Sequence, residues 1–461
     1  PAAASAYSDL SLEQLMDLKV ERVYGASRQS QKVTQAPSSV SIVTADDIRL
    51  FGWRTLADVL RSVRGFYASD DRNYTYLGMR GFQRPGDYNT RILVLVDGHR
   101  MNDNIYDSSY FGREAMIAVD MIERVEVVRG PSSSLYGSSA FFGVINIVTK
   151  RGSEVSGEVG TLGSYEGRFA FNHKFRSNLE WQLSGSHFTS AGQKRIYYPE
   201  FDPSISDSPA AANDGIAERA DREDAAHLFT ALSYHDFTLS AFVSRRLKTV
   251  PTASYGTVFN DGRERRGDRR AYVDAKFDRA TGDHRVLGRV FYDQYRYSGQ
   301  YPYDYATPGT RPDITLESDG AIGEWIGTEW QFDLRAVPDH AFIAGWEFRE
   351  SMRERQYYST SLDDLRRSRN LGLFGQWEGT FGKRLQLSAG LRYDHYFGSF
   401  GGTLNPRVAA IYGVTGTSTV KLLYGEAFRA PNPYERFYST VPRTSTLQPE
   451  RIRTQELVFE Q

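Results

Sequence analysis

The chain has 461 residues, with 56 basic and 57 acidic side chains and a net charge of −1. This length is too great for one ordinary core, so two domains are expected, and the charge balance argues against a surface that binds nucleic acid throughout. The mean hydropathy is −0.50, and because no run of about 18 apolar residues occurs, no transmembrane helix is expected. With no cysteine, the chain has no disulfides, thiolate metal ligands or cysteine nucleophiles.

The N-terminal third reads as short, mixed elements. The first residues, PAAASA, look like a mature end left by signal-peptide removal, although an arbitrary boundary would look the same. Residues 8–18 predict a short helix, with Ser11 and Gln14 placed as a capping box. Residues 19–44 are expected to be extended, and residues 45–64 to form a second helix that ends at Gly65.

The stretch 93–150 predicts buried strands joined by glycine-containing turns. Val94 and Val96 lie on a strand that turns at Asp97-Gly98, which is a hairpin signal. The run IERVEVVRGPSSSLYGSSAFFGVINIVTK at 122–150 holds a β-branched strand, a break at Arg-Gly-Pro, a Ser/Gly loop and a second strand. The chain up to about residue 150 is therefore predicted to be a small mixed α/β domain.

From about residue 154 the hydrophobic period becomes two. Leu179, Trp181 and Leu183 alternate with polar residues, and the run 385–393 does the same. A water-soluble sandwich could show this alternation, but three features favour an outer-membrane barrel: the strands are long, aromatic residues gather near their ends, and short turns alternate with long loops. The short turns are expected at 176–178, 280–283 and 382–383, and the long loops at about 191–222, 250–267, 298–318 and 355–368.

Several motifs, in this order, resemble the TonB-dependent outer-membrane transporters. They are GMRGF at 78–82, LVLVDGHR at 93–100, the run at 122–150, NPRV at 405–408, AFRAPNPYERF at 427–437, LQPE at 447–450 and TQELVFEQ at 454–461. Each motif is weak alone, whereas their order and spacing together are specific, and they cover nearly the whole chain. The resemblance implies a mainly β protein of the bacterial outer membrane, in which a mixed α/β plug fills an antiparallel transmembrane β-barrel.

The expected organisation is an N-terminal helix and Ton-box-like segment at 1–27, a plug at 28–152 and a barrel at 153–461. We count roughly fourteen strands after residue 154, whereas such transporters have about 22 strands around a plugged lumen. Because an open sheet edge in lipid leaves backbone groups unpaired, we expect an incomplete or cleaved chain, or a second polypeptide that supplies the remaining strands.

The resemblance assigns roles to two groups of residues. Arg80 and Arg129 are expected to form a plug–barrel lock with Glu456, which the alternation with Leu457 and Phe459 turns toward the lumen. The residues Val20, Glu21, Arg22, Val23 and Tyr24 resemble a Ton box, an extended segment that binds the periplasmic energy-transducing protein TonB by strand addition, although they could equally be the first plug strand.

A third group consists of tyrosines and arginines that suit an anionic, partly aromatic ligand through cation–π contacts and hydrogen bonds. The predicted ligand-binding residues are Arg72, Tyr74, Tyr76, Arg84, Tyr88, Tyr301, Tyr303, Tyr305, Tyr357 and Tyr358. For any single tyrosine, a general loop or interface role is the simpler interpretation. The arginines at 263, 265, 266, 269 and 270 are interpreted as a solvated face, or as contacts to lipopolysaccharide phosphates, rather than as a nucleic-acid site.

The predicted function is energy-coupled uptake of a scarce, large nutrient, with a ferric siderophore or another metal chelate as the first choice. Receptors of the same architecture for cobalamin, haem or a saccharide, and a receptor that serves mainly signalling or adhesion, remain alternatives; a passive porin conflicts with a plug. The histidines are scattered and no HExxH, GxSxG or GxxxxGK[ST] motif occurs, so no enzyme, cofactor or metal site is expected. The expected partners are TonB, the transported ligand and outer-membrane lipid.

Overall fold

The computed structural model describes residues 22–25, 28, 31–32, 35–83, 86–115, 117–208, 210–307, 310–335, 337–359, 361–382, 384–415, 418–438 and 447–461. The predicted helix at 8–18 and the Ton-box-like residues Val20 and Glu21 lie outside these ranges. Within them, no helix is long and apolar enough to cross a membrane.

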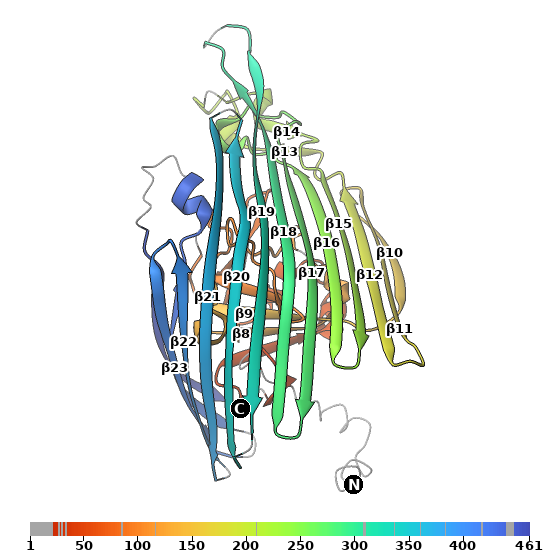
Figure 1. Ribbon diagram of the computed structural model, residues 1–461. Coiled ribbons are helices and arrows are strands. Elements are labelled where there is room, and N and C mark those ends of the chain that lie inside the picture. Colours follow the sequence, from red (N-terminus) through yellow and green to blue (C-terminus); the bar gives the residue numbers. More distant parts are fainter. Residues whose placement is uncertain are drawn as a thin grey trace.

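A 14-stranded antiparallel sheet, here called the wall, dominates the structure and curves around the smaller N-terminal elements (Figure 1). Its strands pair in chain order, apart from the small β13–β14 hairpin, and β10 and β25 come first and last in that order. The wall strands are β10 Glu154–Gly160, β11 Ser164–Lys174, β12 Leu179–Ser190, β15 Glu223–Tyr234, β16 Phe237–Thr249, β17 Arg265–Thr281, β18 His284–Asp304, β19 Ile314–Leu334, β20 His340–Tyr358, β21 Leu362–Phe381, β22 Leu385–Phe397, β23 Gly401–Gly413, β24 Thr419–Arg429 and β25 Glu450–Glu460.

The elements before the wall, here called the plug, surround a five-stranded sheet of order β3-β8-β9-β6-β7, in which β6 and β9 run parallel. The strands are β1 Arg22–Val23, β2 Gln31–Lys32, β3 Ser39–Thr44, β4 Phe66–Asp70, β5 Thr75–Met79, β6 Ile92–Val96, β7 His99–Arg100, β8 Ile122–Arg129 and β9 Gly143–Thr149; the helices are α2 Ala45–Phe51, α3 Leu56–Arg61 and α4 Ser133–Tyr136. Leu93, Val125 and Val127 are fully buried, as the apolar runs predict.

The helix predicted at 45–64 is two helices. Thr44 and Thr55 each cap one of them through a complete capping box. Between the helices, Gly52 adopts a left-handed conformation with φ of 66° and donates its backbone N–H to the last carbonyls of α2. The stretch with continuous apolar spacing is therefore divided into two helices, because each capping threonine starts a helix of its own.

Side chains of the wall alternate between its two faces. On β25, Leu457 and Phe459 are 76% and 63% exposed on the outer face, whereas Glu456 and Glu460 turn inward. Several charged residues of the inner face are buried against the plug, among them Arg392 and Asp394. Apolar side chains outside and charged side chains inside are the pattern of a barrel wall in lipid, and the predicted mainly β fold with about fourteen strands is confirmed.

Two of the four predicted long loops are largely strand. In the predicted loop 298–318, β18 continues to Asp304 and β19 begins at Ile314. In the predicted loop 355–368, β20 continues to Tyr358 and β21 begins at Leu362. The reason is visible in the sequence, because Tyr301, Tyr303 and Tyr305 themselves alternate with period two, and cross-strand pairing satisfies the backbone whether or not the side chains are apolar. Short connections lie at the opposite end of the wall (Figure 1).

Candidate functional site

A tyrosine-rich cavity of about 670 Å³ lies between the plug and the end of the wall that is far from the short connections. The plug contributes loop residues around β5 and β6, and the wall contributes β18, β19 and the segment after β24. The lining residues are Asn73, Tyr74, Tyr88, Tyr106, Tyr110, Tyr255, Arg266, Tyr295, Tyr297, Tyr301, Tyr303, Asp319, Tyr358, Ser361, Leu362, Tyr434 and Tyr438. The volume lies within the range of small-molecule binding sites.

Hydrogen bonds made by the tyrosine hydroxyl groups fix several of these rings. The Tyr110 and Tyr295 hydroxyls are 2.8 Å apart and join the plug to the wall. Tyr301 donates to Asp319 Oδ2 at 3.0 Å, and Tyr438 donates to the same oxygen at 3.2 Å. The aromatic rings therefore form a pre-organised surface.

The described lining of the cavity carries little net charge. Its arginine, Arg266, is paired with Glu264 at 3.0 Å and lies over the Tyr301 ring at 3.9 Å. The lining also contains the carboxylate of Asp319. Burial raises the pKa values of the plug residues Tyr74 and Tyr106 well above their ordinary range, so their hydroxyls stay neutral at physiological pH. The site thus offers aromatic faces and neutral hydrogen-bonding groups.

The structure brings together only part of the predicted ligand-binding set. Tyr74, Tyr88, Tyr301, Tyr303 and Tyr358 line the cavity, whereas Arg72, Tyr76, Tyr305 and Tyr357 are not among its lining residues and Arg84 lies outside the described part of the chain.

The residues that do not line the cavity have other contacts. Arg72 forms an ion pair with Asp221 at 3.7 Å, and Tyr76 donates to Asp71 at 2.9 Å. Tyr305 is 60% exposed. Arg72 thus lies outside this cavity and pairs with an acidic residue of the segment before β15, and its role in ligand binding stays a prediction.

Sequence reasoning missed several lining residues, notably Tyr106, Tyr110, Tyr434 and Tyr438. A signal was present in part, because the AFRAPNPYERF motif contains Tyr434. Tyr106 and Tyr434 are far apart in the chain, yet their ring centroids are 5.0 Å apart. Only the packing of the plug against the wall brings them together.

Arg80 and Glu456 form a two-pronged contact between plug and wall. The Arg80 Nη1 and Nη2 atoms donate to the two Glu456 carboxylate oxygens at 2.7 and 2.8 Å. The expected third member, Arg129, donates instead to Ser41 Oγ at 3.1 Å and to the Arg64 carbonyl at 3.2 Å, all within the plug. Its role in a lock is thus not supported by a direct bond to Glu456, and the lock itself remains a prediction.

Further plug–wall contacts were not foreseen. Arg91 of the plug donates to both Glu450 oxygens of β25, at 2.9 and 2.7 Å, and Arg429 of β24 shares that carboxylate at 2.7 Å. Arg392 of β22 donates to the Leu135 carbonyl of α4 at 3.1 Å. The plug is therefore attached to β22–β25 at several points.

The described end of the Ton-box-like segment is bound to the plug. Arg22 and Val23 form β1, which pairs with β2. The buried Glu126 carboxylate accepts hydrogen bonds from the backbone N–H groups of Tyr24 and Gly25 at 3.1 and 3.0 Å. These residues form a short plug strand in the present structure, and binding of TonB there remains a prediction.

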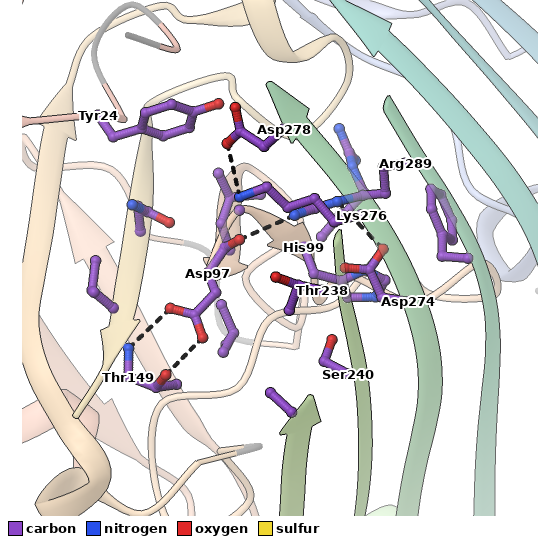
Figure 2. A pocket seen from close by; sticks show the side chains of 18 of the residues that line it. Tyr24, Asp97, His99, Thr149, Thr238, Ser240, Asp274, Lys276, Asp278 and Arg289 are labelled. Carbon is purple, nitrogen blue, oxygen red and sulfur yellow. Dashed lines mark hydrogen bonds and ion pairs between the residues drawn. The ribbon is translucent and has the colours of Figure 1, made fainter. Parts of the chain in front are cut away.

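A second cavity, of about 360 Å³, lies between the plug and the wall near the short connections. Figure 2 shows its charged lining, with Asp97 of the plug facing Asp274, Lys276 and Arg289 of the wall. Arg289 bonds to the Asp97 carbonyl at 3.1 Å and lies 3.3 Å from Asp274. Arg289 thus joins Asp97 of the plug to Asp274 of the wall, which suits an internal plug–wall contact. Within the described ranges, no cluster of three or more metal-ligating side chains occurs.

Comparison with known proteins places these features in a family. The model of the TonB-dependent receptor plug domain matches residues 32–144, and the model of the TonB-dependent receptor-like β-barrel matches residues 218–460. The chain is 28% identical over 455 residues to the vitamin B12 transporter BtuB of Vibrio cholerae, an alignment that covers 95% of this chain and 67% of BtuB.

Solved structures share the fold. The ferric enterobactin receptor PfeA from Pseudomonas aeruginosa superimposes with a TM-score of 0.66 at 18% identity, covering 87% of this chain and 64% of PfeA. The ferric yersiniabactin uptake receptor FyuA from Yersinia pestis gives 0.63 at 18% identity, covering 92% of this chain and 69% of FyuA. The chain thus spans about two thirds of the length of these proteins.

The chain belongs to the TonB-dependent receptor family of the bacterial outer membrane. Members of this family are transporters and receptors and not enzymes, as the sequence predicted. The family implies TonB and a transported ligand as partners.

Proposed function

We propose that this protein takes up a metal chelate of low net charge, with a ferric siderophore as the first choice and cobalamin as the alternative, across the outer membrane with energy from TonB. The tyrosine-lined cavity carries this proposal, since it is large enough for a small chelate and offers rings and neutral hydrogen-bonding groups. Arg266 is already compensated by Glu264, so a highly anionic chelate finds little positive charge. The relatives are named for vitamin B12 and for ferric chelates.

Contacts of the N-terminal segment at the other end of the plug support coupling to TonB. The cavity contacts the plug loops near β5 and β6, and β6 pairs with β9 beside the Glu126 contacts that hold Tyr24 and Gly25. The loop before β6, which contributes Tyr88 to the cavity, and the contacts of the N-terminal segment with Glu126 thus adjoin the same five-stranded sheet. Release of that segment would present an extended strand for augmentation by TonB.

The test measures binding of three probes to the purified protein: a ferric hydroxamate, a ferric catecholate and cyanocobalamin. Tyr434→Ala removes a ring that packs on Tyr106, and we expect the affinity for the preferred probe to fall about tenfold, the effect of ~1.4 kcal/mol for one aromatic contact. Tyr305→Ala, on an exposed ring outside the cavity, is the matched control and should leave affinity unchanged. Absence of binding for all three probes, or equal losses in both variants, would refute the proposal.

A further inference from the structure

A row of arginines crosses three adjacent wall strands on the outer face. Arg245 of β16 pairs in register with Arg269 of β17, which pairs with Arg296 of β18. All three side chains are exposed. By contrast, Arg266 and Arg270 of the same basic stretch are buried on the inner face, so the five-arginine cluster seen in the sequence is divided between the two sides of the wall.

The protein itself does not compensate this row. Arg245 lies 3.5 Å from Asp224, which also accepts from His187 at 2.9 Å. Neither Arg269 nor Arg296 has an ion pair or side-chain hydrogen bond within the described part of the chain. Three guanidinium groups thus face one carboxylate. Like charges directly opposite one another on neighbouring strands are destabilising, so the row calls for an anionic partner from outside.

The height of the row on the wall identifies where that partner lies. Below the arginines, the outer face of β16 carries Val243, Leu239 and Phe237, each 48% exposed or more, and Phe237 packs on Phe277 at 5.0 Å near the short turns. The eight residue steps from Phe237 to Arg245 correspond to a rise of ~20 Å, at ~3.3 Å per residue and a strand tilt of ~40°. The lipid-facing band of such barrels is ~25 Å tall, so the arginines lie near its upper edge.

The upper edge belongs to the outer leaflet, because the short turns of outer-membrane barrels face the periplasm. Directly above the row, the next outward positions are Leu247 on β16, Gly267 on β17 and Ser298 on β18, and the Leu247 side chain lies beside Gly267. Guanidinium groups bind phosphate with paired hydrogen bonds, and basic residues near an anionic lipid surface strengthen binding to it.

We propose that Arg245, Arg269 and Arg296 form a binding site on the outer wall for the phosphate groups of an outer-leaflet glycolipid, the lipid A part of lipopolysaccharide. The phosphate lies against the three guanidinium groups, and the acyl chains lie along the apolar face below. The site is separate from the tyrosine cavity, which is on the inner face.

The experiment measures lipid A binding to the detergent-purified protein by native mass spectrometry. The double variant Arg269→Gln with Arg296→Gln should bind bisphosphorylated lipid A at least tenfold more weakly than the wild type does. Dephosphorylated lipid A should bind the wild-type protein as weakly as bisphosphorylated lipid A binds the double variant. The control is Arg369→Gln, an outward arginine that is 61% exposed and paired with Glu350 at 3.0 Å; it should bind lipid A normally. The double lysine variant, which keeps the charge, should retain most of the affinity.

Two further measurements separate lipid binding from a general loss of stability and from binding of a free anion. In lipid-free detergent the double glutamine variant should melt no lower than wild type, since like-charge repulsion has been removed. Inorganic phosphate at millimolar concentration should not displace lipid A; displacement would show a free-anion site and overturn the lipid assignment. Equal lipid A binding by wild type and the double glutamine variant would overturn the site altogether.

Discussion

The contact between Arg80 and Glu456 yields the sharpest prediction, because it joins the plug to β25 by two charge-assisted hydrogen bonds. The perturbation is Glu456→Gln, which keeps the shape of the side chain and removes its charge. The Arg80 side chain is 33% exposed and that of Glu456 is 15% exposed. The pair therefore lies between exposed pairs, worth ~0.2–1 kcal/mol, and buried pairs, whose disruption costs ~3–5 kcal/mol.

An intermediate value of about 2 kcal/mol corresponds to an increase of roughly 30-fold in the population in which this part of the plug detaches. Amide hydrogen exchange measures that population directly. The Gly130 N–H, which donates to the Phe142 carbonyl at 2.8 Å, adjoins the pair, since a β-carbon on Gly130 would lie 2.8 Å from Glu456 Oε1. We expect its exchange to accelerate by that factor in Glu456→Gln.

The matched control is Arg453→Gln, on the same strand but the outer face, where Arg453 pairs with Glu426 at 3.0 Å and is 75% exposed. Its effect on Gly130 exchange should be under threefold. The charge exchange Arg80→Glu with Glu456→Arg should restore part of the protection lost in either single variant. Unchanged exchange in Glu456→Gln, or the same acceleration in the control, would refute the reasoning that this pair holds the plug.

Two further predictions concern buried plug carboxylates. Glu126→Gln removes the charge that holds Tyr24 and Gly25, so the amides of these two residues should exchange at least ~10-fold faster. Glu123→Gln, at an exposed position on the same strand, should leave their exchange unchanged. Equal exchange rates in the two variants would contradict the assignment. Burial raises the pKa of Glu114 from 4.5 to about 7, against the lowering effects of Arg246 and the Thr75 N–H. The contribution of Glu114 to plug stability should therefore be greatest below about pH 4.5 and fall by up to ~3 kcal/mol as pH rises through 7. A melting series in which Glu114→Gln shows the same pH dependence as the wild type between pH 4.5 and 7 would refute this.

Much of the architecture follows from local sequence patterns. Alternation with period two is a property of neighbouring residues, so it identified the wall strands and the inward side of Glu456 without any tertiary information. The Asp97-Gly98 turn is equally local, and both residues have positive φ in the structure, 49° and 81°. The same logic failed at 45–64, where apolar spacing continued across two helices and the second cap at Thr55 was not recognised.

Tertiary structure alone decided the site and the division of charges. The cavity combines Tyr106 of the plug with Tyr295 and Tyr434 of the wall, and no pattern within one segment encodes the meeting of residues so far apart. Packing also decided that Arg129 bonds within the plug while Arg80 reaches the wall, although each arginine directly precedes a glycine. The sequence by itself determined which residues face the same side of a strand, because that periodicity is fixed by the backbone; which partner each side meets depends on how the plug and the wall pack together.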